Sequence, residues 1–381
     1  MVFALRAASV FDGERAVDRP TVLVDGDTIV AAGVAVPASV PVVDLGAATL
    51  LPGLIDCHQH LCFDGNGTLE EQVAGVDDDA LLNRARTSAQ RALRGGVTTL
   101  RDLGDRSYVT LGLRDDLSLP TILAAGPPIT RAGGHCWFLG GICGGEADLR
   151  EAVRVRAERQ CDVVKVMVTG GYGTPTFPMW KTQFGRDELR FVVEESHRAG
   201  LPVAAHCHGV AGIEDALDAG ADSIEHCTFY TAQARPEPDE ALLQRLAASG
   251  VPISATLGRL PDYLPPPDLA ANRPILFGAW RRLRELGATL VVGTDAGIGP
   301  HKPHDVLAYA LGDLIESGHS LVDGLRALTS VAAKACGVAE HKGRLSRGFD
   351  ADIIAVNGDA LTEPNALVSI AAVWRAGDRV R

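Results

Sequence analysis

Residues 54–63 read LIDCHQHLCF, an apolar run typical of a buried strand with two histidines at its end. Side chains two positions apart in a strand point to the same face, so His58 and His60 share a face, while Cys57 and Gln59 point the other way. Two interpretations are open at this point. The histidines either grip a metal ion, or they are polar residues that lie close together by chance.

Seven further strand-like runs follow this one along the chain. They are GVTTLRDLG (96–104), PTILAAGPPI (120–129), DVVKVMVTGG (162–171), LPVAAHCHG (201–209), ADSIEHCTF (221–229), VPISATL (251–257) and ATLVVGTDAG (288–297). Amphipathic segments that end in Gly lie between them, among them residues 78–96, 186–200 and 239–250. Eight strands buried on both faces, alternating with helices, predict a parallel (β/α)8 TIM-like barrel rather than an open doubly wound sheet.

Both ends of the chain contain strand-like runs without the long helical segments of the middle. Residues 1–52 contain short alternating runs broken by Asp-Gly and Gly turns, and residues 345–381 return to strand-like runs after the last helical segment. We therefore expect the two ends to pair into one small β-domain, with the barrel occupying residues 53–344.

Composition limits the classes of ligand and compartment. The 381 residues carry a formal net charge of −12, which disfavours a nucleic-acid partner, so a small-molecule or peptide ligand is expected. The chain shows neither a secretory signal nor an apolar stretch of membrane-spanning length. Its eight cysteines form no CxxC pair, which favours small buried residues in a reducing environment over a disulfide framework. We expect a soluble, cytoplasmic protein.

Three further potential metal ligands end predicted strands. His206 closes LPVAAH, His226 closes ADSIEH, and Asp295 closes LVVGTD. Active sites of parallel barrels are built at the C-terminal ends of the strands. A single buried histidine is more often a satisfied core residue, but four histidines and an aspartate on one rim favour a site for zinc or a similar divalent ion.

Lys165 lies in the middle of the predicted strand DVVKVMVTGG. A buried lysine is costly unless it is paired or chemically changed. A snorkelling chain or a buried ion pair is one explanation for it. The other is reaction with CO₂, because an ammonium has only donors and cannot bind a metal, whereas a carbamate is an anion able to bridge two ions.

Several motifs together resemble the amidohydrolase superfamily, and its Xaa-Pro dipeptidase-like branch near imidazolonepropionase in particular. They are LPGLIDCHQH (51–60), GVTTLRDLG (96–104), GPPITRAGGH (126–135), VKVMVTGG (164–171), SIEHCTF (223–229), VGTDAG (292–297) and GFDADIIAV (348–356). The resemblance covers almost the whole chain, and it implies that the domain formed by the two termini is a β-sandwich.

The resemblance also implies a binuclear centre, with zinc as the first choice of metal. One ion would be held by His58, His60 and Asp295, the other by His206 and His226, and a carboxylated Lys165 would bridge them. A hydroxide shared by the two ions would attack an amide-type carbonyl, and Asp295 would act as general base and then as general acid. Relatives in this family assemble, so a homo-oligomer is expected.

Substrate contacts are expected from three residues, namely His135 in GGHCWFLGG, Tyr230 after SIEHCTF, and His208, which shares a strand face with His206. Arg131 and the loop residues Phe177, Met179 and Trp180 are further candidates. For all of these, packing within loops is an equally good explanation. Residues 172–184 contain no carboxylate, which argues against a preference for Arg or Lys side chains in the substrate.

The leading hypothesis is a binuclear metal-dependent hydrolase that cleaves an amide or peptide C–N bond in a dipeptide or an N-acyl amino acid. A mononuclear deaminase or cyclic-amide hydrolase, like imidazolonepropionase, is the alternative, and Lys165 argues against it. A non-catalytic scaffold is the third hypothesis, although every expected ligand position is filled. Cysteines adjoin three of the ligand histidines, so a bulged strand there would change the ligand set.

Overall fold

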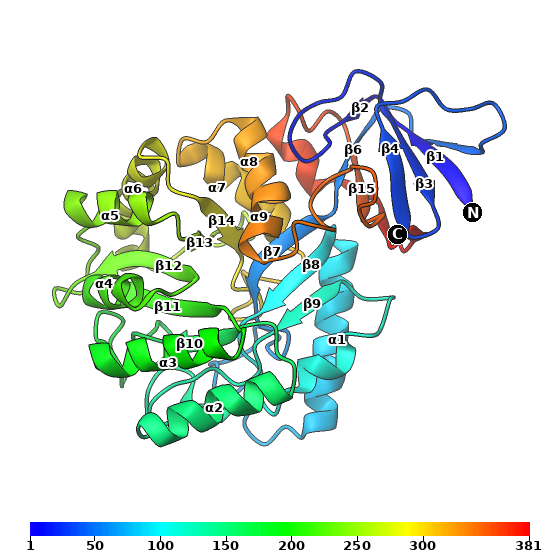
Figure 1. Ribbon diagram of the computed structural model, residues 1–381. Coiled ribbons are helices and arrows are strands. Elements are labelled where there is room, and N and C mark those ends of the chain that lie inside the picture. The colour runs from blue at the N-terminus through cyan, green and yellow to red at the C-terminus, as the bar shows by residue number, and fades with distance from the viewer. Residues whose placement is uncertain (175) are drawn as a thin grey trace.

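The computed structural model describes residues 1–174 and 176–381. A barrel of parallel strands surrounded by helices makes up most of the molecule, and a smaller all-β part lies at one side of it (Figure 1). Both chain ends lie in this smaller part, blue at the N-terminus and red at the C-terminus (Figure 1).

In the residues that the structure describes, eight parallel strands form the barrel. They are β7 (Leu54–Gln59), β8 (Val97–Asp102), β9 (Thr121–Ala124), β10 (Val164–Met167), β11 (Val203–Gly209), β12 (Ser223–Tyr230), β13 (Ile253–Thr256) and β14 (Leu290–Gly293). Ile129 pairs with Val166 and Gln59 pairs with Ala296, which closes the two strand groups into one ring. The backbone N–H of Asp295 donates to the carbonyl of His58 at 2.7 Å, so the last strand is tied to the first. The predicted barrel is confirmed.

Helices cover the outside of the barrel (Figure 1). They are α1 (Asp78–Arg94), α2 (Glu146–Glu158), α3 (Arg186–Arg198), α4 (Val210–Ala219), α5 (Glu240–Ser249), α6 (Pro267–Glu285), α7 (Ala310–Glu316), α8 (Leu321–Ala327) and α9 (Ser330–Ala335), with short 3₁₀ turns η1 (Val109–Leu113), η2 (Trp137–Leu139), η3 (Leu307–Tyr309) and η4 (Pro364–Val368). In α1 the side chain of Asp77 caps the first turn by accepting from the N–H of Ala80, and Leu81, Ala85 and Ala89 form its buried stripe.

Among the described residues, two sheets make up the β-part. One has the order β4 (Thr28–Ala32), β3 (Thr21–Asp25), β1 (Val2–Arg6), β5 (Val42–Asp44), and the other has the order β17 (Asp378–Arg379), β16 (Ile370–Arg375), β15 (Ile353–Asn357), β6 (Ala48–Pro52), β2 (Ser9–Val10). Buried side chains of both sheets share one core, including Val24 and Ile29 from the first and Leu50, Ile353 and Trp374 from the second. The predicted β-sandwich of both termini is confirmed. The domain limits at residues 52/53 and 344/345 stay a prediction.

Local backbone geometry brings the strand ends together on one rim. His226 has φ 66° and Asp295 has φ 58°, left-handed values that turn each side chain off the regular strand path. Gly293 precedes this turn, and a Cβ added there would lie 2.2 Å from the Cβ of His58. Only glycine therefore allows β14 to approach β7 closely enough for Asp295 to meet the two histidines.

Candidate metal centre

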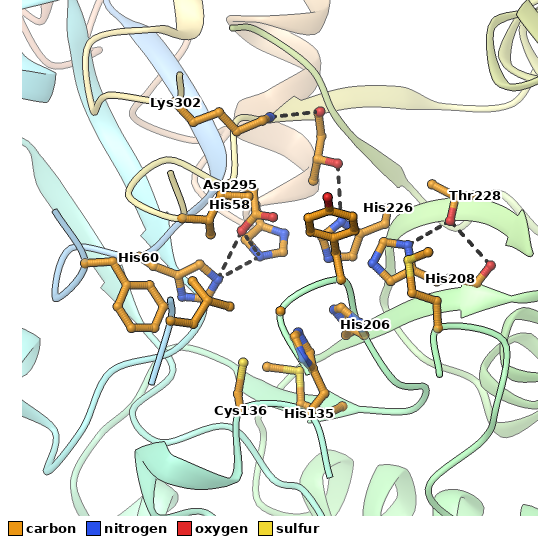
Figure 2. A pocket seen from close by; sticks show the side chains of 18 of the residues that line it. His58, His60, His135, Cys136, His206, His208, His226, Thr228, Asp295 and Lys302 are labelled. Carbon is orange, nitrogen blue, oxygen red and sulfur yellow. Dashed lines mark hydrogen bonds and ion pairs between the residues drawn. The ribbon is translucent and has the colours of Figure 1, made fainter. Parts of the chain in front are cut away.

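A cavity of about 460 Å³ opens at the C-terminal ends of the barrel strands, and histidines dominate its floor (Figure 2). The ring centroids of His58 and His226 lie 5.1 Å apart, and those of His226 and His206 lie 4.5 Å apart. His60 and His135 extend this row at its two ends, with centroids 5.2 Å from His58 and 4.6 Å from His206. The predicted strand-end residues are thus gathered into one continuous site.

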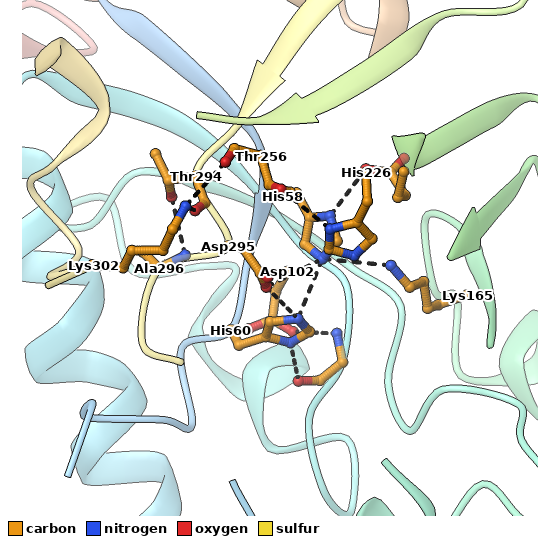
Figure 3. Close-up of polar contacts among 12 residues, drawn as sticks. His58, His60, Asp102, Lys165, His226, Thr256, Thr294, Asp295, Ala296 and Lys302 are labelled. Atoms are coloured by element: carbon orange, nitrogen blue, oxygen red, sulfur yellow. Dashed lines mark hydrogen bonds and ion pairs between the residues drawn. The ribbon is translucent and has the colours of Figure 1, made fainter. Parts of the chain in front are cut away.

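His58, His60 and Asp295 form the first group of potential ligands (Figure 3). The Nε2 atoms of the two histidines are 3.3 Å apart, and Asp295 Oδ1 lies 3.3 Å from His60 Nε2 and 3.6 Å from His58 Nε2. Each Nδ1 atom is directed elsewhere, that of His60 to the carbonyl of Gly104 at 3.0 Å and that of His58 to Glu225 at 3.0 Å. Both Nε2 atoms therefore converge with one carboxylate oxygen, as a divalent ion requires.

His206, His208 and His226 form the second group. The Nδ1 atoms of His208 and His226 contact the hydroxyls of Thr228 and Thr256 at 2.7 and 3.2 Å, which leaves Nε2 of each ring free. His206 is oriented the other way, because its Nε2 contacts the carbonyl of Gly170 at 3.1 Å and its Nδ1 is the free nitrogen. The sequence predicts His208 as a substrate contact on the same strand face as His206. The HCH spacing of residues 206–208, the same as in HQH, also makes it a potential ligand.

Lys165 lies beside His58 of the first group (Figure 3), and it lines the same cavity as the second group. Its side chain has no exposed surface, and Nζ is 3.4 Å from Nε2 of His58. In the described part of the chain, no ion pair joins Lys165 to a carboxylate, so the buried ion pair considered from the sequence does not form there. Burial lowers the pKa of Lys165 from 10.5 to about 8. A buried amine without a direct counterion fits a group that CO₂ converts to an anion.

The protonation states of the site suit metal binding. Burial lowers the pKa of His58 and of His208 to about 4, and burial with neighbouring imidazoles holds the pKa values of His206 and His226 well below 6.5. These rings are neutral near pH 7, as ligands must be.

The pair formed by His60 and Asp295 behaves differently from these rings. Burial opposes ionisation of both groups, but their contact raises the pKa of His60 and holds that of Asp295 well below its usual range. Asp295 therefore stabilises the protonated form of His60, and an ion that binds between these ligands competes with that proton.

The expected substrate-facing residues are distributed unevenly around the cavity. His135 lines it and is fixed through Nδ1 to the hydroxyl of Thr174 at 2.9 Å. Tyr230 also lines it, and its hydroxyl accepts from Asn272 at 3.1 Å. Arg131 does not line it in the described residues, because its guanidinium is bound to the carbonyls of Cys143 and Gly144 and to Glu188.

The loop after β10 contributes one of its three candidates to this cavity. Met179 lines the main cavity, whereas Phe177 and Trp180 line a shallower neighbouring hollow. Lys302, which was not a sequence candidate, lies at the cavity wall with its ammonium on the carbonyls of Thr256 and Thr294.

The strand pairing is irregular beside Cys57, Cys207 and Cys227. The pairing of β7 with β8 shifts register between Asp56 and Gln59. The pairing of β11 with β12 shifts register between Cys207 and Gly209, and Cys227 has φ 50°. Cys207 and Cys227 are nevertheless buried in the hydrophobic core of the barrel. Among the described residues no cysteine belongs to either ligand group, so the bulge leaves the predicted ligands in place.

Two buried charges near the site were also missed from the sequence. Glu225 accepts hydrogen bonds from His58 Nδ1 and from Arg101 Nη2, the latter at 2.8 Å. The sequence signal for both was a charged residue inside an apolar strand run, Glu225 in ADSIEHCTF and Arg101 in GVTTLRDLG.

Comparison with known proteins decides the family. The sequence profile of the amidohydrolase family matches residues 49–380. The chain belongs to this family. It is a metal-dependent hydrolase acting on C–N bonds, and the resemblance inferred from its motifs is confirmed. No helix in the described part of this amidohydrolase is both long and apolar enough to cross a membrane.

Relatives of known activity are similar over most of its length. An ochratoxinase of Aspergillus niger is 27% identical, with 86% of this chain and 75% of the relative covered. An imidazolonepropionase of Deinococcus deserti is 26% identical, covering 90% and 87% respectively. A crystal structure of a Xaa-Pro dipeptidase with bound methionine in its active site superposes with a TM-score of 0.85 at 25% identity, covering 100% of this chain and 99% of that one.

Proposed function

We propose that this amidohydrolase is a binuclear enzyme that cleaves the amide or peptide bond of a small substrate, such as a dipeptide or an N-acyl amino acid. The observation that carries the proposal is the placement of buried Lys165 beside two adjoining ligand groups. A mononuclear site needs only one of these groups. The relatives named as a Xaa-Pro dipeptidase and an ochratoxinase support the substrate class.

The residues fit two divalent ions, for which zinc is the first choice. His58, His60 and Asp295 would hold one, and His206 and His226 the other. A carbamate on Lys165, formed as the neutral amine takes up CO₂ and releases a proton, would be shared. Such a pair of ions polarises a carbonyl and lowers the pKa of water towards about 7.

In this proposal Asp295 handles the proton of the reaction. Its Oδ1 already contacts the Nε2 atoms of His58 and His60, and the cavity lies in front of it. In the proposal it accepts a proton from the attacking water and delivers it to the leaving nitrogen. His135, Tyr230 and His208 line the same cavity, and they would hold the substrate's carbonyl or carboxylate oxygens.

The lining of the cavity supports an apolar substrate. Six aliphatic or thioether side chains contribute to it, two of them from α6, namely Leu69, Met167, Met179, Leu269, Leu276 and Ile298. Among the described lining residues Asp295 is the one carboxylate, whereas Lys302 adds a cation. A substrate with an apolar side chain therefore suits this lining better than one with a basic side chain.

Metal content per chain is the test. Protein expressed with zinc and bicarbonate should contain two ions, and Lys165→Ala should contain fewer, as measured by elemental analysis. A library of dipeptides and N-acyl amino acids then identifies the substrate. One ion in both proteins would contradict the binuclear proposal and favour the mononuclear alternative, which the similarity to imidazolonepropionase keeps open.

Compartment and assembly belong to the same proposal. All eight cysteines are free, and seven of them are buried, which supports a cytoplasmic location. Assembly into a homo-oligomer rests on the family resemblance alone, and the mass of the protein in solution tests it.

A further inference from the structure

Glu225 is a buried carboxylate that belongs to neither ligand group. It lies on β12 with no exposed surface, one residue before His226. Its Oε1 accepts from Arg101 Nη2 at 2.8 Å and from the hydroxyl of Ser223 at 2.6 Å, and its Oε2 lies 3.0 Å from Nδ1 of His58. The carboxylate thus occupies the barrel interior on the far side of the His58 ring from the cavity.

An ionised carboxylate only accepts hydrogen bonds, so it fixes the position of one proton. Nδ1 of His58 must carry the hydrogen, and the lone pair of the neutral ring is then on Nε2, which faces His60 and Asp295. A carboxylate at this position also raises the basicity of an imidazole as a metal ligand.

The other candidate ligands have neutral partners. His60 and His206 contact the carbonyls of Gly104 and Gly170. His226 contacts the hydroxyl of Thr256, and a hydroxyl either donates or accepts, so it fixes no tautomer. Among the described ligand histidines, His58 is therefore the one whose second nitrogen is held by a charge.

Arg101 completes the arrangement. Its Nε donates to the carbonyl of Cys57 at 2.8 Å, one residue before His58, while Nη2 neutralises Glu225. The guanidinium and the carboxylate therefore fix both the backbone and the ring of His58. Their charges cancel within a buried pair, so the carboxylate adds no free negative charge to the site.

We infer that Glu225 is a positioning residue that makes the His58–His60–Asp295 group the tighter of the two metal sites, so that the two ions bind in a fixed order. This inference rests on the proposed binuclear function. The first group should bind its ion more tightly because a carboxylate supports one of its histidines. The histidines of the second group are supported by carbonyls and hydroxyls only.

Glu225→Gln tests the inference with little change in volume. The amide oxygen can still accept from Arg101 and Ser223, which turns the NH₂ group towards Nδ1 of His58 and demands that Nδ1 accept. The ring must then carry its proton on Nε2 and cannot bind an ion there. Titration of the metal-free protein with Zn²⁺ against a chromophoric chelator should show a loss of about 10- to 100-fold in the affinity of the first ion. With Co²⁺ as the probe, the absorption spectrum of the first equivalent should change.

Two further variants separate positioning from folding. Glu225→Asp retains the charge beside Arg101 but shortens the side chain by one methylene, so the contact with His58 is lost while the ion pair can persist. It should show the same selective loss of the first ion with an unchanged unfolding temperature of the metal-free protein. Thr256→Val is the matched control, because it removes the partner of His226 and should weaken the second ion instead.

The outcomes are distinct. Selective weakening of the first ion in both Glu225 variants supports the inference. Wild-type affinity for the first ion in Glu225→Asp, or equal weakening of both ions, overturns it. A wild-type protein that takes up fewer than two ions contradicts the proposed function itself, whatever the variants show.

Discussion

Replacing Lys165 with methionine should remove a large pH dependence from the stability of the metal-free protein. Methionine is one atom shorter than lysine, keeps the apolar contacts of the stem and carries no amine. In the wild-type chain the free amine is fully buried, and burial lowers its pKa from 10.5 to about 8. At about 1.4 kcal/mol per pH unit, this difference corresponds to about 3 kcal/mol.

The sign follows from where the proton is bound. Between pH 8 and 10.5 the unfolded chain keeps the proton on Lys165 and the folded chain has released it, so raising the pH favours the folded state. The wild-type protein should therefore gain most of this 3 kcal/mol relative to Lys165→Met across that interval. Below pH 8 both states are protonated, and the difference between the two proteins should be constant.

Urea unfolding of both proteins at several pH values measures the difference directly. The buffers contain a chelator and are free of CO₂, so that the amine is neither bound to metal nor carboxylated. The contributions of other groups that titrate in this range cancel when the unfolding free energies of the two proteins are subtracted. Lys181→Met removes an exposed lysine and serves as the control that should show no such gain. If the unfolding free energies of wild type and Lys165→Met differ by the same amount from pH 8 to 10.5, the account of Lys165 as a buried amine is refuted.

Three other substitutions test the site and its surroundings. Asp295→Asn should reduce kcat by about 10²-fold or more while the circular dichroism spectrum stays that of a folded protein, because the amide cannot take up the proton; near-normal turnover would contradict the mechanism. His208→Asn should raise KM and leave two ions bound, whereas loss of one ion would make His208 a ligand. Asp105 is buried, and burial, followed by the charge of Asp102, raises its pKa to about 7. The unfolding free energy of the wild-type protein should therefore fall relative to that of Asp105→Asn as the pH rises from about 4 to 7. Parallel dependence of the two unfolding free energies on pH would contradict a raised pKa of Asp105.

The alternation of strand and helix in the barrel was readable from the sequence because its signals are local. Runs such as residues 201–209 and 288–297 are short, apolar and bounded by glycine, and each became a strand of the ring. The strand ends carried their histidines and Asp295 to one rim for the same reason, since parallel strands end at the same side. The closure of the ring between β14 and β7 depended on Gly293, whose role is visible only when the His58 side chain lies against it.

The partners of the buried charges were not readable in the same way. Arg101, Lys165 and Glu225 each interrupt an apolar strand run, yet the sequence analysis singles out only Lys165 as unusual. Arg101 and Glu225 are 124 positions apart in the chain, and their contact arises because β8 and β12 both project side chains into the barrel. The burial of Arg101 and Glu225 is explained by their ion pair, which the sequence alone does not reveal. Lys165 has no carboxylate partner in the described structure, whereas Arg101 and Glu225 neutralise each other. The free-energy cost of burying the Lys165 amine is therefore not offset by an ion pair, and conversion of the amine to a carbamate would remove that cost.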